Sequence, residues 1–403
     1  FDGYDFRDYA ASFSPRNAHV KDGSFSPDVA PLAYSGFGTG DFRKSAVAIR
    51  NHWGNDATDF RYVSHKIYAG KPRLTGLPAT YADENEADTL EILLRDSTTA
   101  AELTLVCTAF RDVPVITQSV RLYNGSDVPM DIEKLYSASV SLNDMDYDLC
   151  HLYGRWGAER NLERTTLRHG QQSISSSRGS SSHYHNPFVS LVRHGATEDY
   201  GEVYGFNLVY SGSFDMTVDC DYYETTRLLA GINPDGFTWR LEAGETFQTP
   251  ELVMVYTDAG VGEMSRIFHR LYREHLIRGR WKTEKRPLLI NSWEAAFFHF
   301  DSDKLVNFAE HAREIGIEML VMDDGWFGVR NDDTNSLGDW YVNEEKLPGG
   351  LGVLIDRVKA LGLKFGIWYE PEMISPDSEL YRAHPDWCLH VPNRENSIAR
   401  SQY

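Results

Sequence analysis

The sequence predicts a multidomain protein of the β plus α/β class, in which an N-terminal antiparallel β-sandwich is followed by a parallel sheet covered by helices. Residues 1–257 contain many short runs of strand-forming residues, separated by Gly, Asn, Asp or Pro, without helical segments between them. After Pro287, short apolar runs alternate with amphipathic helical segments, a pattern typical of β-α-β units. The length of 403 residues also suits two or three domains better than one.

The predicted sandwich strands are short and end at turn-forming residues. Clear examples are residues 103–107, 115–122, 203–209 and 252–256. The second run leads into Asn124-Gly125-Ser126, and Asn-Gly is a strong signal for a β-hairpin turn. The same tripeptide also fits a glycosylation sequon, but nothing in the sequence indicates secretion, so we favour the hairpin turn.

A change of hydrophobic period follows the sandwich. Met264, Ile267, Phe268 and Leu271 are spaced for one face of a helix, and a basic segment over residues 278–282 comes next. We therefore predict three regions: the sandwich at 1–257, a linker helix with a connecting segment at 258–287, and the α/β domain at 288–403.

Three apolar strands are predicted in the second domain, at residues 288–293, 319–322 and 364–368. Two amphipathic helices lie between them. The first spans residues 303–314, with Asp301 or Ser302 as its cap and Gly316 at its end, and the second follows Pro348 and stops at Gly362. Parallel strands of this kind place their functional residues at their C-terminal ends.

Asp323 and Asp324 directly follow the second of these strands. Paired carboxylates accept hydrogen bonds from vicinal hydroxyl groups, which suits the edge of a sugar, although a metal or a solvated loop would also explain them. Trp293 and Trp368 follow the first and third strands and could form a stacking wall around a sugar ring, or simply pack a core.

Other candidate groups have two explanations each. Glu370 and Glu372 flank Pro371 and could act as an acid and a base, but we prefer that they pair with nearby Arg or Lys. Trp326 and Trp340 are expected to pack the loop after the second strand. His183 and His185 could bind a metal, yet no third ligand is apparent, so no metal or cofactor is expected.

Composition narrows the class of ligand. The formal net charge of −19 makes nucleic acid and anionic membranes poor partners. No run approaches the ~18 apolar residues of a membrane helix. The 13% aromatic content is equally consistent with a carbohydrate site and with a large β core. Four widely spaced cysteines and the absence of a signal peptide favour reduced thiols and a cytoplasmic location.

Several motifs resemble those of glycoside hydrolase family 36, the α-galactosidases. They are Trp293 with Phe297, Val321-Met322-Asp323-Asp324-Gly325-Trp326-Phe327, Gly338-Asp339-Trp340, and Gly366-Ile367-Trp368-Tyr369-Glu370-Pro371-Glu372-Met373. Upstream, Gly38-Thr39-Gly40-Asp41-Phe42-Arg43 and Ser177-Arg178-Gly179-Ser180-Ser181-Ser182-His183 resemble the N-terminal sandwich of the same family.

This resemblance implies a (β/α)₈ TIM barrel after the sandwich and a retaining hydrolase of terminal α-galactosides such as melibiose and raffinose. It implies that Asp323 and Asp324 hold galactose hydroxyls, that Trp293 and Trp368 form pocket walls, and that Arg400 lines the same pocket. It also implies a homo-oligomer, expected to be a tetramer, and a galactoside as the only small-molecule partner.

The chain departs from the family pattern at its C-terminal end. The family's nucleophile is an Asp in a Lys-Trp-Asp motif on the fourth barrel strand, and its acid/base is a later Asp; neither precedes Tyr403. We therefore expect a barrel truncated after about three strands, no catalytic residue in this chain, and a longer parent polypeptide. The alternatives are a non-catalytic galactoside-binding protein, or a related α-N-acetylgalactosaminidase or galactosyl transferase.

Overall fold

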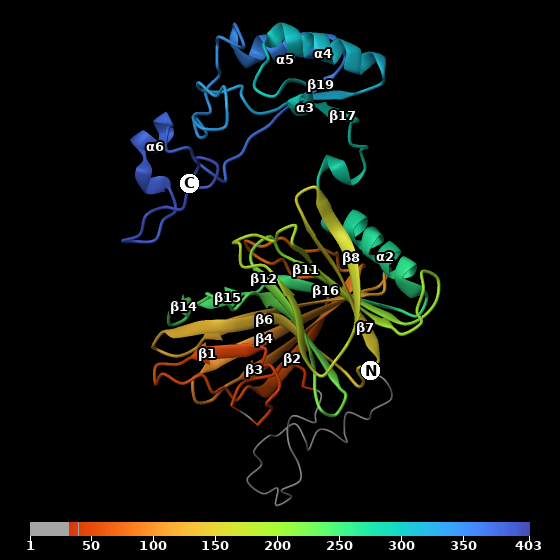
Figure 1. Cartoon of the computed structure of the whole chain (residues 1–403). Coiled ribbons are helices and arrows are strands. Elements are labelled where there is room, and N and C mark those ends of the chain that lie inside the picture. The colour runs from red at the N-terminus through yellow and green to blue at the C-terminus, as the bar shows by residue number, and fades with distance from the viewer. Residues whose placement is uncertain (1–31, 39) are drawn as a thin grey trace, which may run out of the picture. The chain divides into compact units, whose positions relative to one another are not determined.

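The computed structural model describes residues 32–38 and 40–403 (Figure 1). Thr39, in one of the family-like motifs, and the residues before Leu32 lie outside the described part of the chain. The chain divides into two compact units, Phe1–Lys282 and Thr283–Tyr403.

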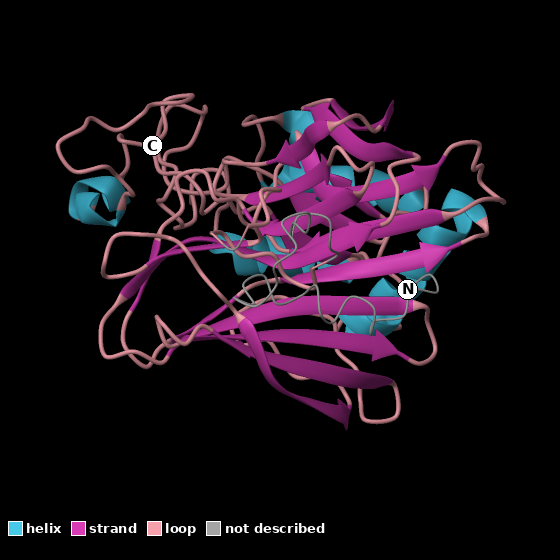
Figure 2. Ribbon diagram, turned by 90° about the horizontal axis from the view of Figure 1, so that it is seen from below, coloured by secondary structure: helices cyan, strands magenta, loops and turns pink. Residues whose placement is uncertain are grey.

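The first unit is built from two antiparallel sheets (Figure 2). The six-stranded sheet has the order β1-β6-β13-β12-β9, with β14 beside β6. Its strands are β1 (Val47–Arg50), β6 (Met130–Leu142), β9 (Gly170–Ser175), β12 (Phe214–Cys220), β13 (Thr226–Ile232) and β14 (Trp239–Leu241).

The ten-stranded sheet has the order β2-β3-β4-β5-β16-β11-β10-β7-β8, with β15 beside β5. Its strands are β2 (Arg61–Ala69), β3 (Ala87–Arg95), β4 (Ala101–Phe110), β5 (Val115–Asn124), β7 (Tyr147–Arg155), β8 (Ala158–Thr166), β10 (His185–Arg193), β11 (Val203–Val209), β15 (Thr246–Gln248) and β16 (Glu251–Thr257). All four strand runs singled out in the sequence are confirmed as β4, β5, β11 and β16.

Apolar side chains from both sheets share a core, as a sandwich requires. Leu103 of β4 and Leu122 of β5 pack with Ile132 of β6 and Leu229 of β13, and all four are fully buried. Burying side chains of this size stabilises the fold by about 1.5–3 kcal/mol each. The predicted antiparallel sandwich is therefore confirmed.

The predicted hairpin turn at Asn124-Gly125 is wrong. β5 pairs with β4 and β16, whereas β6 pairs with β1 and β13, so the chain crosses here from one sheet to the other. The fully buried Asn124 side chain donates to the carbonyls of Val128, at 2.8 Å, and Leu241, at 3.1 Å. Asn124 therefore stabilises the crossover between the sheets through the hydrogen bonds of its side-chain amide, and it does not form the tight turn of a hairpin.

The helix predicted from residue 262 onward is α2 (Gly260–Leu271), and it packs on the ten-stranded sheet. Its apolar side chains, including Met264 and Phe268, join the core of the first unit. A π-helical turn, η2 (Tyr272–Leu276), and a short 3₁₀ turn, η3 (Arg280–Lys282), follow. Much of the segment expected as a linker thus belongs to the first unit, which extends to Lys282.

The second unit contains three parallel strands, in the order β17-β18-β19. These strands are β17 (Leu289–Asn291), β18 (Met319–Met322) and β19 (Lys364–Ile367). The helices are α3 (Trp293–Ala296), α4 (Ser302–Glu314), α5 (Gly350–Ala360) and α6 (Glu379–Ala383), with a 3₁₀ turn η4 (Pro385–Trp387). Asp301 caps α4 by accepting from the Lys304 amide at 2.8 Å, as the sequence predicts.

Among the described residues, helices cover one face of this sheet and leave the other face without a helix. Ile290, Leu320 and Phe365 are aligned across the three strands, and all three join the core that contains α4 and α5 side chains. Asn291, Val321 and Gly366 form the next row and point the opposite way. The β-α-β-α-β order predicted from sequence is confirmed, and within the described residues the strands form an open sheet rather than a closed barrel.

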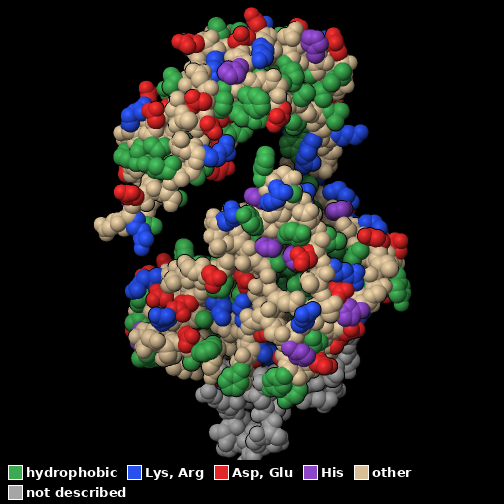
Figure 3. Space-filling model, in the orientation of Figure 1, with side chains coloured by type: hydrophobic (Ala, Val, Ile, Leu, Met, Phe, Trp, Pro, Cys, Tyr) green, Lys and Arg blue, Asp and Glu red, His purple; other side chains and the backbone are tan. Residues whose placement is uncertain are grey.

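On the face shown in Figure 3, acidic and basic side chains are interspersed over both units. Among the described residues, no helix combines the length and apolar character needed to cross a membrane.

Candidate active site

Asp323 lies just beyond the C-terminal end of β18. By strand alternation it continues the row of Val321 and Asn291, on the face that helices do not cover. The Asn291 amide donates to one Asp323 oxygen, and the Asp323 backbone N–H donates to the Ser292 hydroxyl at 3.1 Å. The first strand therefore fixes the carboxylate that follows the second.

Asp324 points the other way and is buried. Its carboxylate accepts from Arg330 Nε at 2.9 Å and from Arg330 Nη2 at 2.8 Å, a bidentate pair in which both residues are almost fully buried. Arg330 also donates to the Asn335 carbonyl at 2.7 Å. The two adjacent aspartates thus have different surroundings, one partly accessible and one locked in an internal ion pair.

Trp293 and Trp368 are linked through the residues around this ion pair. Trp293 meets Phe298 edge-on with ring centroids 5.1 Å apart, and Trp368 stacks on Phe327 at 6.4 Å. The Arg330 guanidinium lies 5.8 Å from both phenylalanine rings. The structure therefore joins the two predicted wall tryptophans and Asp324 in one continuous cluster.

Trp326 and Trp340 pack against other members of this aromatic cluster. The buried Trp326 donates its indole N–H to the Trp368 carbonyl at 3.0 Å. Trp340 contacts Phe327, with centroids 4.5 Å apart. Both pack the loop after β18, as the sequence predicts.

Lys346 ties this loop together and was not identified from sequence. Its ammonium donates to the carbonyls of Phe298, Gly325 and Arg330 at 2.9–3.0 Å. Burial lowers the pKa of Lys346, while the charge of Asp324 opposes that shift. A lysine after Asn343 and Glu345 looks like a surface charge, and only the folded loop reveals its three carbonyl partners.

Arg400 is placed at the edge of the same region. Its side chain is 78% exposed and reaches Asp333, in the loop after β18, at 3.7 Å. The structure therefore brings Arg400 to the loop that carries Asp324, but not into the Asp324–Arg330 pair.

Glu370 follows β19 and lies among other carboxylates. Burial, and then the charges of Glu372 and Asp324, raise its pKa above the usual value, while Arg330 and Arg400 act in the opposite direction. Within the described residues, the ion pairs expected for Glu370 and Glu372 are not formed, so that expectation is wrong. Glu370 instead adds to a local excess of negative charge beside the aspartates.

The histidine motif belongs to the first unit. His183 lines a hollow of about 480 Å³ with Glu159, Arg160, Ser181, Ser182 and Asn186. The His185 ring meets the His151 ring edge-on at 5.5 Å. Neither His183 nor His185 belongs to a cluster of three metal-ligating side chains within the described residues.

In the second unit, the cluster combines hydrogen-bond acceptors with aromatic surfaces. Asp323 offers a partly accessible carboxylate, and the half-buried rings of Trp293 and Trp368 offer apolar faces. Hydroxyl groups donate to carboxylates, and the C–H faces of sugars pack on aromatic rings. The arrangement suits a neutral polyhydroxylated ligand.

Two family models and several known proteins match this chain. Residues 4–242 match the glycosyl hydrolase family 36 N-terminal domain, and residues 246–403 match the melibiase family. The chain is 52% identical over 392 residues to the α-galactosidase AgaA of Geobacillus stearothermophilus, covering 97% of the chain and 54% of that protein. It is 45% identical to the bifunctional α-galactosidase/sucrose kinase AgaSK of Mediterraneibacter gnavus, covering 98% of the chain and 43% of that protein.

Solved structures give the same relationship. The crystal structure of the Geobacillus stearothermophilus AgaA matches with a TM-score of 0.94 and 51% identity, over 98% of this chain and 55% of that one. A variant of that enzyme in complex with raffinose also matches with a TM-score of 0.94, over 96% and 54% of the two chains. The chain thus spans about half the length of the curated relatives it matches, and it belongs to glycoside hydrolase family 36.

Proposed function

We propose that the chain carries the galactose-binding part of a retaining α-galactosidase that hydrolyses terminal α-galactosides such as melibiose and raffinose-type oligosaccharides. The observation that carries this proposal is the placement of Asp323 and Asp324 at the end of β18, with Trp293 and Trp368 in the same cluster. The names of the relatives and the raffinose complex support it.

Each residue has a distinct part in the proposed site. Asp323, fixed by Asn291, accepts from hydroxyl groups of the galactose ring. Asp324, held in its ion pair with Arg330, forms the floor of the pocket. Trp293 and Trp368 enclose the ring, and Arg400 closes the edge.

The bond-breaking groups are proposed to come from the rest of the whole protein. A retaining glycosidase needs a nucleophilic carboxylate and an acid/base carboxylate about 5 Å apart. None of the residues assigned to the site here is proposed for either role. The sugar-binding residues of this chain and the two catalytic carboxylates would then face each other in a barrel whose first three strands are β17, β18 and β19.

The direct test uses the whole protein and p-nitrophenyl-α-galactoside. Asp323→Asn keeps the shape but weakens acceptance from hydroxyl groups. A lost hydrogen bond to a charged group costs about 1.5–3 kcal/mol, so we expect kcat/KM to fall roughly 10- to 150-fold. Asp356→Asn, at an exposed position on α5, is the matched control. Equal activity of the two variants would contradict the proposed role of Asp323.

Product analysis separates the proposal from its alternatives. Release of galactose from raffinose with retained configuration supports it. Preference for an N-acetylgalactosaminide, or transfer of galactose to an added sugar in place of hydrolysis, identifies one of the related enzymes instead. Galactose binding by the whole protein without any cleavage identifies a binding protein.

We also propose a homotetramer in a reducing compartment, the cytoplasm. All four cysteines, Cys107, Cys150, Cys220 and Cys388, are free thiols in the structure, which supports the second part. Light scattering of the whole protein tests the assembly, and a mass near that of a monomer would contradict it.

A further inference from the structure

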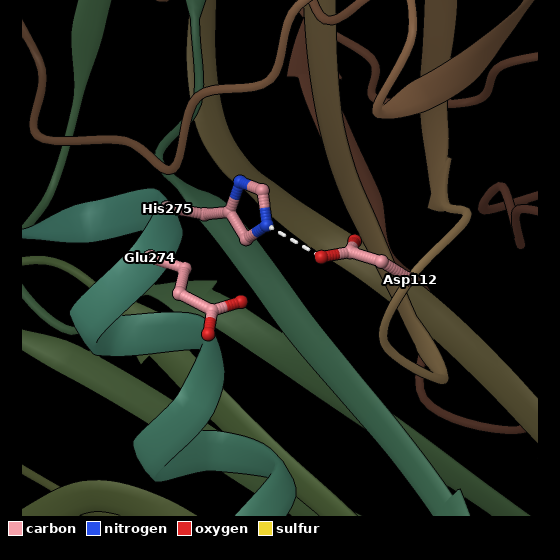
Figure 4. Close-up of side chains that lie close together, drawn as sticks. All are labelled: Asp112, Glu274 and His275. Carbon is pink, nitrogen blue, oxygen red and sulfur yellow. Dashed lines mark ion pairs between the residues drawn. The ribbon is translucent and has the colours of Figure 1, made fainter.

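Three potential metal ligands meet on the first unit, outside the candidate active site (Figure 4). Asp112 lies in the turn between β4 and β5, while Glu274 and His275 lie in the π-helical turn η2 that follows α2. One ligand atom from each side chain lies within 4.8 Å of the other two, and His275 Nε2 is 3.5 Å from an Asp112 oxygen. Single π-helical turns occur frequently at functional sites.

The His275 ring is oriented as a metal ligand would be. The residue is only 2% exposed, and its Nδ1 lies 3.0 Å from the Tyr81 carbonyl. A carbonyl accepts but cannot donate, so Nδ1 carries a proton and Nε2 is the ring nitrogen that is left to bind a further group. This hydrogen bond to a backbone carbonyl is the usual outer partner of a metal-ligating histidine.

His275 Nε2 is buried and has no hydrogen-bond partner. It points at the Asp112 carboxylate, which can only accept when ionised (Figure 4). Two acceptors that face each other at 3.5 Å need a positive charge between them, either a second ring proton or a cation. The Glu274 carboxylate adds a second negative charge and a second oxygen ligand at the same point, and Arg270 offsets part of this charge.

We propose that Asp112, Glu274 and His275 form a binding site for a divalent transition metal, best suited to Zn²⁺. One nitrogen and two carboxylate oxygens are ligands that zinc accepts, with water completing a tetrahedron. Zinc–ligand bonds of about 2.0–2.1 Å place neighbouring tetrahedral ligands about 3.3 Å apart, close to the His275–Asp112 separation. The ion would join the β4–β5 turn to the end of α2.

Arg270 competes for the same carboxylates. Its guanidinium lies 3.3 Å from an Asp112 oxygen and 3.1 Å from a Glu274 oxygen, and it also donates to the Asp112 carbonyl at 2.9 Å. The Arg270 side chain is 46% exposed and can swing into solvent when the metal binds. Arginine therefore reduces the affinity of the site without being one of its ligands.

Equilibrium dialysis of the whole protein against Zn²⁺ tests the proposal. We expect the parent protein to bind one zinc ion per chain at this site. In Asp112→Asn and in His275→Gln, this binding should be lost or at least tenfold weaker. Asp112 is exposed, so its variant keeps the fold even if the buried histidine variant does not. His269→Gln removes an exposed histidine of α2 and is the matched control, with zinc binding unchanged.

Arg270→Met supplies an independent readout, because removal of the competitor should strengthen zinc binding severalfold. Co²⁺ substituted at the site should give visible absorption bands of a tetrahedral complex, absent from Asp112→Asn. Zinc binding that is the same in the parent, Asp112→Asn and His269→Gln would overturn the proposal.

Discussion

Arg330 determines the state of the acidic pair that follows β18. Asp324 is buried, and a buried carboxylate is costly unless an opposite charge and hydrogen bonds compensate it. Arg330 supplies both, from only six residues further along the chain. The internal ion pair therefore fixes the conformation of the loop from Asp324 to Arg330 as well as the orientation of the Asp324 carboxylate.

Arg330→Met should strongly destabilise the second unit. Removing one member of a buried ion pair leaves the other uncompensated, which costs about 3–5 kcal/mol of unfolding free energy. Urea denaturation followed by tryptophan fluorescence measures this loss. Arg357→Met is the control, because Arg357 pairs with Asp303 on the surface, where such pairs contribute only about 0–1 kcal/mol. Equal losses in the two variants would show that the Asp324 pair is not decisive.

Glu370 gives a pH-dependent prediction. Its folded-state pKa is raised above the ordinary value of 4.5, so the folded state binds the proton more tightly than the unfolded chain does. The stability that the protonated group contributes is present below pH 4.5 and is lost as pH rises through the folded-state pKa. Glu370→Gln should therefore gain stability relative to the parent as pH increases through this window.

Thermal unfolding of the two proteins at several pH values checks this prediction. Glu344→Gln, at an exposed position in the loop before α5, is the matched control. A stability difference between Glu370→Gln and the parent that does not change with pH would contradict the assignment of the raised pKa to this residue.

Sequence reasoning could identify some residues of the candidate site and not others. Asp323, Asp324, Trp293 and Trp368 stand where apolar strand runs end, and that position is visible in the sequence. Arg330 and Lys346 lie in polar loop sequence, and a charged residue reveals its burial only when its partners are known.

At the scale of the element, α2 and β11 approach each other closely because β11 contains Gly205. A methyl group at this position would lie 2.6 Å from a ring carbon of Phe268 and 2.7 Å from the Met264 sulfur. Gly205→Ala should therefore push α2 away from the sheet and cost about 1–3 kcal/mol of unfolding free energy.

A second glycine provides the opposite case. A methyl group at Gly352, at an exposed position of helix α5, meets nothing within 4 Å, so Gly352→Ala should raise stability by up to about 1 kcal/mol. Chemical denaturation of both variants tests the pair. Destabilisation by Gly352→Ala, or its absence in Gly205→Ala, would contradict these contacts.

The local signals predicted α4 and α5 well because periodicity, caps and terminal glycines agree there. Gly316 and Gly362 both adopt positive φ just after the helices, as their positions suggested. The Asn124-Gly125 signal failed for a different reason. A turn motif encodes local backbone shape, whereas the partner of the next strand is decided by packing between two sheets.

At the scale of the whole molecule, the boundary between the two units should be accessible to protease. Residues 282–286 are all exposed and include Lys282, Lys285 and Arg286. Limited digestion with trypsin should release a fragment that begins at Arg286, since cleavage after Lys285 needs no disruption of either core. N-terminal sequencing identifies the product, and Lys285→Gln should slow its release. Cleavage inside β4 or β5 before this cut would contradict the division into units.

The order of the two folds could be predicted from sequence because β-rich and β-α-β patterns differ over hundreds of residues. The extent of the first unit could not. Whether α2 connects two domains or packs on one depends on which surface its apolar stripe meets, and Gly205 in a distant strand decides that.

The opposed surroundings of Asp323 and Asp324 make this part of the chain sensitive to insertions and deletions. If β18 slipped by one residue against β17, Asp323 would turn to the opposite face of the sheet, and Met322 or Asp324 would take its place beside Asn291. An insertion or deletion in the turn between α4 and β18 is therefore compatible with the candidate site only if the pairing register of β18 with β17 is restored by Met319. This limits the loop lengths that evolution or protein engineering can use here.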